Sequence, residues 1–150
     1  MIVVDIDGTL TLSDGTPACL GVGEITKERI LEIMDPVRVA NIKPRLEIIE
    51  KVKNLYYHGE FIAIVTGRWD YLADITYAWL NNHNIPFHGI AMRKADQWNI
   101  KSVAIKLMSF QDLLENKTIP QKPLNEILWI DDDQEMIDEV TKLGLRTMKV

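Results

Sequence analysis

Two aspartates separated by one residue, Asp5 and Asp7, follow an apolar run at the start of the sequence. Because side chains alternate along a strand, both carboxylates are expected to point to the same side. Two like charges at the end of a buried strand repel each other unless a cation neutralises them or one carboxyl holds a proton. Gly8 permits a sharp turn, and Thr9 adds a hydroxyl beside the pair. This arrangement is typical of a metal-assisted nucleophile.

Polar residues also follow two later apolar runs that read as strands. One run ends at Val65 and is followed by a Thr-Gly-Arg sequence, and another ends at Ile130 and is followed by three aspartates. Since ligands bind beyond the carboxyl ends of parallel strands, these groups are expected to gather near the first two aspartates. Aspartate oxygens suit a hard cation, Mg²⁺ above all, while a hydroxyl and backbone amides can donate to phosphate oxygens. The residues of this predicted phosphate and metal site are Thr66, Gly67, Arg68, Asp131 and Asp132.

Strand and helix patterns alternate along the chain, which predicts an α/β fold with a mainly parallel sheet. Strands are expected at residues 2–6, 61–65, 85–92, 127–130 and 145–150. Helices are expected at 26–34, from Pro44 to just before Gly59, at 70–82, around 103–114, and at 134–143. A hairpin turn is expected at Asp14 and Gly15, and the pair at 35–36 is expected to stop the first helix.

Length and composition narrow the class of protein. A chain of 150 residues matches one domain, residues 1–150, with room for a real core. The net charge of -5 gives no general attraction to nucleic acids or anionic membranes. The single cysteine, Cys19, excludes an internal disulfide and favours a reducing, cytoplasmic setting. No signal peptide pattern or membrane-spanning apolar run is present in these residues, and the oligomeric state stays open.

Taken in order, these motifs resemble those of the haloacid dehalogenase (HAD) superfamily of phosphohydrolases. The first motif is residues 5–10, the second is Thr66, the third is a lysine, and the fourth is the pair at 131–132. The resemblance covers nearly the whole chain. It implies a HAD-like Rossmannoid three-layer sandwich with a minimal cap or none, in which residues 9–43 form a flap and a short insert.

The resemblance implies a role for each matching residue. Asp5 would be the nucleophile that becomes an aspartyl phosphate, and Asp7 the general acid and base. The Asp5 carboxylate, the Asp7 backbone carbonyl and Asp131 would bind Mg²⁺, with Asp132 acting through a water or as a supporting partner. Thr66 and the lysine would hold the transferring phosphoryl group. An acid at the position of Asp7 separates the phosphatases of the superfamily from its dehalogenases.

Two lysines compete for the third motif. Lys106 lies between Val103 and Phe110, at the edge of an apolar helix stripe, which favours a partly buried ammonium that points into the site. Lys101 lies nearer the helix start, where solvent is expected, so Lys106 is the preferred candidate. Arg68 fits a substrate contact and a surface ion pair equally well.

The sequence says less about the substrate than about the catalytic residues. The segments that could hold a cap are short, so the site is expected to be open, and a small phosphorylated metabolite or nucleotide is the first expectation. A narrower resemblance is to the phosphatase domain of phage-type polynucleotide kinase-phosphatases, which implies a nucleic-acid 3′-phosphate end as the alternative. That resemblance is carried by Thr66 to Arg68, Trp79-Leu80, Met92-Arg93, residues 101–106 and residues 130–132.

Some features weigh against the nucleic-acid alternative. The kinase domain of that family has no counterpart in these residues, and the flap after Leu10 has no arginine. Ser102 stands where the family has an acid four residues before its lysine. The net charge of -5 also disfavours tight binding to a polyanion.

Two other classes of protein remain open. A protein of the HAD fold could bind Mg²⁺ and a phosphorylated ligand without turnover, although the intact pair of Asp5 and Asp7 argues against this. A receiver-type signalling domain also combines aspartates, a threonine and a lysine. In that class the acidic pair precedes a separate phospho-acceptor on a later strand, and the doubled acids at 131–132 fit the HAD order better.

Overall fold

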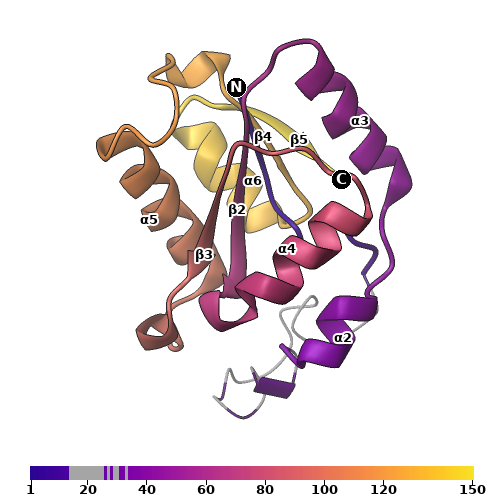
Figure 1. The fold of residues 1–150 in the computed structure, drawn as a ribbon. Coiled ribbons are helices and arrows are strands. Elements are labelled where there is room, and N and C mark those ends of the chain that lie inside the picture. The colour runs from indigo at the N-terminus through magenta and orange to yellow at the C-terminus, as the bar shows by residue number, and fades with distance from the viewer. Residues whose placement is uncertain (14–25, 27, 29–30, 33) are drawn as a thin grey trace.

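The computed structural model describes residues 1–13, 26, 28, 31–32 and 34–150. Within these residues one parallel sheet has the strand order β3-β2-β1-β4-β5 (Figure 1). The strands are β1 Ile2–Val4, β2 Ile62–Trp69, β3 Gly89–Arg93, β4 Leu128–Asp131 and β5 Arg146–Lys149. The first strand is therefore central, and it is flanked by the two strands that carry the other polar motifs.

Helices cover both faces of the sheet, which makes a three-layer sandwich (Figure 1). On one face α3 (Leu46–Tyr57) and α4 (Ala73–Asn82) pack on Ile2 and Val4 of the central strand. On the other face α5 (Ser102–Glu115) and α6 (Gln134–Lys142) pack around Val3. Because successive side chains of β1 point to opposite faces, this short buried strand contributes to the hydrophobic core on each side of the sheet. The α/β fold with a parallel sheet is confirmed.

The first part of the chain departs from the expected pattern at residues 35–36. Instead of only ending a helix, this pair begins α2 (Pro36–Asn41). The Asp35 carboxylate accepts a hydrogen bond of 2.9 Å from the Arg38 amide, and proline at the first helical position has no amide to leave unpaired. The expected hairpin at Asp14 and Gly15 lies outside the described residues, as does much of the expected helix at 26–34.

Strand β2 is longer than the sequence pattern indicates. It continues through Trp69, so Thr66, Gly67 and Arg68 belong to the strand rather than following it. Its pairing with β3 shifts register between Val65 and Trp69. The apolar run ends at Val65, but the strand continues through Thr66 and Arg68, whose polar side chains are buried. An apolar run therefore marks the end of this strand too early. Among the described residues, no helix is both long and apolar enough to cross a membrane.

Candidate active site

Three aspartates converge at the carboxyl edge of the sheet. Asp5 directly follows β1, and Asp131 is the last residue of the adjacent β4. The Asp5 amide donates a 3.1 Å hydrogen bond to the Ile130 carbonyl, which fixes the two strand ends side by side. One carboxylate oxygen from each of Asp5, Asp131 and Asp132 lies within 4.8 Å of the others. Asp5 is 3 % exposed and Asp131 is fully buried.

A buried lysine joins this cluster from α5. The Lys106 ammonium lies 2.8 Å from Asp131 Oδ2 and 3.2 Å from Asp5 Oδ1. Val103 and Phe110 anchor the same helix in the core, and Lys106 is buried beside them. Lys101 precedes the helix, is exposed, and lies 3.8 Å from a surface glutamate. The structure therefore brings Lys106 to Asp5 and leaves Lys101 at the surface.

Burial and like charges govern the titration of the cluster. Burial raises the pKa of Asp5 well above its usual range; the Lys106 ammonium opposes this rise, while the neighbouring aspartates add to it. Burial likewise raises the pKa of Asp132, with a further contribution from Asp131. Burial alone would lower the pKa of Lys106, but the carboxylates of Asp5 and Asp131 outweigh it and raise that pKa, so the ammonium stays charged. Burial thus disfavours the charged forms of Asp5 and Asp132 even with the Lys106 ammonium close by.

Asp131 is held by three donors. Besides Lys106, the buried Trp129 indole donates to Asp131 Oδ2 at 3.1 Å, and the Asp133 amide donates to Asp131 Oδ1 at 3.0 Å. The Asp133 carboxylate turns away and accepts a 2.9 Å hydrogen bond from the Glu135 amide, which caps α6. Asp133 is therefore the N-cap of α6.

Thr9 links the turn after β1 to the end of β4. Its buried hydroxyl donates to Asp132 Oδ1 at 3.2 Å and accepts a 3.0 Å hydrogen bond from the Asp132 amide. Asp132 itself is half-buried. The hydroxyl expected beside the first pair of aspartates therefore serves to orient an aspartate from the last motif.

Asp7 faces a different partner from the other aspartates. The fully buried Arg68 guanidinium donates from Nε to Asp7 Oδ2 at 2.8 Å and from Nη2 to Asp7 Oδ1 at 2.7 Å. The sequence left Arg68 between a substrate contact and a surface ion pair. The structure shows an ion pair, but a buried one, and with the second aspartate of the first motif.

Thr66 and Gly67 lie on β2, next to the central strand. Thr66 is fully buried, and its hydroxyl accepts a 3.2 Å hydrogen bond from the Arg68 amide. A Cβ atom at Gly67 would lie 2.6 Å from the Ser102 hydroxyl at the start of α5, so this hydroxyl would have to move to admit a side chain there. No local sequence pattern predicts this close approach between β2 and α5.

The aspartate cluster fits a small divalent cation. Ligands on a Mg²⁺ octahedron lie at most about 4.2 Å apart, so oxygens within 4.8 Å need only a small adjustment. The all-oxygen donor set also suits a hard cation. The Asp7 carboxylate is paired with Arg68, so the Asp7 backbone carbonyl is the oxygen of this residue that is expected to join such a site.

The turn after β1 tolerates a side chain at position 8 poorly, because of its backbone conformation and its contact with Asp132. The φ of +83° at Gly8 is disfavoured for other residues, and a Cβ there would fall on the Asp132 carboxylate. Gly59 has a similar φ of +85° but open space around it. We expect Gly59→Ala to lower the free energy of unfolding by about 1–2 kcal/mol, the cost of a left-handed conformation.

Gly8→Ala should lose more than Gly59→Ala, since it carries the same backbone strain and also displaces Asp132. Urea denaturation of the two variants measures the difference directly. Equal losses in both variants would show that Asp132 moves aside freely and that the packing of Gly8 against it is unimportant.

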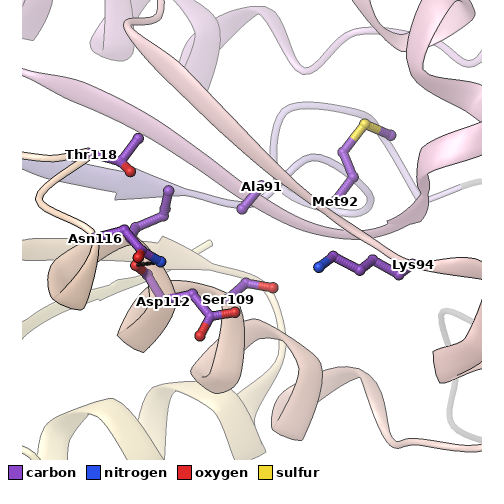
Figure 2. A pocket seen from close by; sticks show the side chains of 8 residues that line it. Ala91, Met92, Lys94, Ser109, Asp112, Asn116 and Thr118 are labelled. Carbon is purple, nitrogen blue, oxygen red and sulfur yellow. Dashed lines mark hydrogen bonds between the residues drawn. The ribbon is translucent and has the colours of Figure 1, made fainter.

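A separate hollow of about 230 Å³ lies between β3 and α5 (Figure 2). None of the predicted site residues lines it. Its walls combine polar and apolar side chains, those of Ala91, Met92, Lys94, Ser109, Asp112, Leu113, Asn116 and Thr118. The aspartate cluster therefore remains the candidate site.

Comparison with known proteins gives structural neighbours only. No family model and no curated protein sequence matches the chain. A chain of the Pnkp1/Rnl/Hen1 complex matches with a TM-score of 0.73 and 17% identity, over 99% of this chain and 45% of that one. A chain of the Pnkp1/Rnl/Hen1 RNA repair complex matches with a TM-score of 0.72 and 17% identity, over 99% and 41%. The present chain thus spans less than half the length of these two neighbours.

A third neighbour is a haloacid dehalogenase-like family protein, a hydrolase from Streptococcus pneumoniae. It matches with a TM-score of 0.60 and 16% identity, over 99% of this chain and 82% of that one. At such identities the likeness shows the fold alone. The chain has the α/β fold of HAD-like hydrolases, as the order of its motifs predicts.

Proposed function

We propose that this protein is a Mg²⁺-dependent phosphomonoester hydrolase that acts through an aspartyl phosphate on Asp5. The observation that carries the proposal is the buried Asp5 carboxylate, which adjoins Lys106 and shares an oxygen cluster with Asp131 and Asp132. The HAD-like fold supports a hydrolase, because it places these groups at the strand ends where such sheets bind ligands.

The reaction would proceed in two displacements. An Asp5 oxygen attacks phosphorus, the bond from phosphorus to the ester oxygen breaks, and Asp7 gives its proton to the leaving oxygen. Asp7 then takes a proton from water as that water attacks the phosphorus on Asp5. The second displacement frees inorganic phosphate and restores the Asp5 carboxylate.

The other site residues would stabilise charge during these steps. The Lys106 ammonium would offset negative charge on the phosphoryl group, and Thr66 and the Gly67 amide would donate hydrogen bonds to its oxygens. Asp5, Asp131, Asp132 and the Asp7 carbonyl would hold Mg²⁺. When bound, that ion would offset the repulsion between the carboxylates and polarise a phosphoryl oxygen.

Metal removal is the direct test of this proposal. We expect the purified protein to hydrolyse p-nitrophenyl phosphate with Mg²⁺, to lose activity in excess chelator, and to regain it when Mg²⁺ is restored. Mg²⁺ should also raise the melting temperature, because a ligand that binds the folded state stabilises it. Full activity in excess chelator would contradict the proposal.

The first candidate substrate is a small phosphorylated metabolite or nucleotide. A nucleic-acid 3′-phosphate end is a second candidate, and the likeness to a chain of an RNA repair complex favours it. A panel of three substrates separates the two candidates. It holds an oligonucleotide phosphorylated at its 3′ end, the same oligonucleotide phosphorylated at its 5′ end, and a mononucleotide. A higher kcat/KM for the 3′-phosphorylated oligonucleotide than for the other two would select the nucleic-acid end.

A further inference from the structure

Arg68 has a partner on every side of its guanidinium. Nε and Nη2 donate to the two oxygens of Asp7, and Nη1 lies 3.5 Å from the Thr76 hydroxyl. The guanidinium carbon lies 5.9 Å from the centre of the Trp79 ring, in cation–π contact. The side chain is fully buried. A guanidinium enclosed in this way presents no free edge to a substrate.

The groups behind Arg68 are themselves fixed. Thr76 and Trp79 are both buried on α4, and the Trp79 indole donates a 2.9 Å hydrogen bond to the Ile42 carbonyl. The shifted stretch of β2 brings Arg68 between this helix and the turn after β1. The guanidinium is therefore a rigid support that reaches Asp7 from the interior.

Asp7 is the exposed member of the pair, with a quarter of its side chain (25%) open to solvent. Two parallel hydrogen bonds fix the plane of a carboxylate as well as its position. Each Asp7 oxygen keeps a second lone pair, since Arg68 occupies one on each. That lone pair remains for a hydrogen bond to a group other than Arg68.

We propose that Arg68 is a positioning residue for Asp7: it holds this carboxylate toward the reacting phosphate and does not bind the substrate itself. The inference rests on the proposed function, in which Asp7 transfers protons. It assigns to Arg68 a role in positioning the group that transfers protons, where the sequence left this residue between a substrate contact and a surface ion pair.

The consequence depends on the leaving group. An alkyl phosphate needs a proton on its leaving oxygen, whereas p-nitrophenolate leaves without one. A misplaced Asp7 should therefore slow the first displacement for the alkyl ester only. It should slow the second displacement, attack by water on the phosphorylated Asp5, for both esters.

The experiment compares Arg68→Met and Arg68→Lys with the matched control Thr76→Val, which removes the third contact and leaves the Asp7 pair intact. For Arg68→Met we expect kcat on an alkyl phosphate to fall about 100-fold, within the range of general acid–base catalysis, with KM nearly unchanged. With p-nitrophenyl phosphate, phosphorylated Asp5 should accumulate. Arg68→Lys should lie between, because one ammonium cannot make both parallel bonds, and Thr76→Val should resemble the unaltered protein.

A double-mutant cycle separates positioning from stability. If Arg68 acts through Asp7, then adding Arg68→Met to Asp7→Asn should change the remaining rate by less than about twofold, because coupled residues are not additive. Melting temperatures report folding for each variant. A second full loss in the Asp7→Asn background would show a role independent of Asp7 and overturn the inference.

Other outcomes are equally decisive. A raised KM with unchanged kcat in Arg68→Met would make Arg68 a substrate ligand. An equal loss on both esters, without accumulation of phosphorylated Asp5, would reduce it to a structural residue. Absence of turnover in the unaltered protein would overturn both the proposed function and the role of Arg68. If the protein turns over substrate and neither Arg68→Met nor Arg68→Lys changes the rate, only the role of Arg68 is overturned.

Discussion

Asp5→Asn is expected to abolish turnover of p-nitrophenyl phosphate in the presence of Mg²⁺, to the level of the blank. An amide of the same shape has no negative oxygen to attack phosphorus, so no covalent intermediate can form. The measurement is steady-state turnover by protein purified in parallel with an Asp112→Asn control, which changes an exposed aspartate away from the cluster. Normal activity in Asp5→Asn would contradict the assignment of the nucleophile.

The same variant should remain folded, which separates its effect from unfolding. Burial raises the pKa of Asp5 in the folded protein, so the folded state binds a proton more tightly than the unfolded one. The stability from this group is then present at low pH and is lost as the pH rises through the raised pKa. Near neutral pH without metal, Asp5→Asn avoids this loss, and its melting temperature should be at least that of the unaltered protein.

Lys106→Ala is expected to reduce kcat about 10²–10³-fold, the usual effect of removing one preorganised donor, about 2.7–4 kcal/mol. The ammonium lies 3.2 Å from Asp5 Oδ1 in a site shielded from water, and the raised pKa of Lys106 keeps it charged. Lys101→Ala should be nearly silent, because that side chain is exposed and pairs with a surface glutamate. Both rates are measured at saturating substrate and Mg²⁺.

Loss of the ammonium also leaves Asp5 and Asp131 facing each other without a cation. Lys106→Met keeps the packing volume better than alanine, so it tests whether the rate loss follows from charge. We expect both variants to be slow, and Mg²⁺ to recover part of their melting temperature. A large loss in Lys101→Ala, with normal rates in both Lys106 variants, would show that the wrong lysine has been assigned.

Much of this site follows from local sequence patterns. The apolar runs that precede Asp5 and Asp131 predict two strands, and the structure shows that these strands are parallel neighbours, which brings the two aspartates to one edge. The position of Lys106 beside an apolar helix stripe predicts a buried ammonium, and the structure places it against both aspartates. These inferences succeed because helix and strand periods fix which side chains share a face.

The Arg68 ion pair could not be predicted in the same way. Arg68 and Asp7 are 61 residues apart, and their contact depends on the register shift in β2 and on the packing of Trp79 against the guanidinium. The strand pattern ends at Val65, so the sequence predicts that Arg68 follows the strand, whereas it lies within β2. Local periodicity carries no information on such a contact, which arises from the packing of three separate elements.

The location of the transferred phosphoryl group tests the central claim most directly. The Asp7→Asn variant should accumulate the intermediate when it is mixed with p-nitrophenyl phosphate and Mg²⁺, and acid quenching followed by peptide mass spectrometry locates the phosphate. The account predicts one phosphorylated peptide, with the modification on Asp5, and none after the additional change Asp5→Asn. Phosphate on any other residue, or turnover without a covalent intermediate, would contradict it.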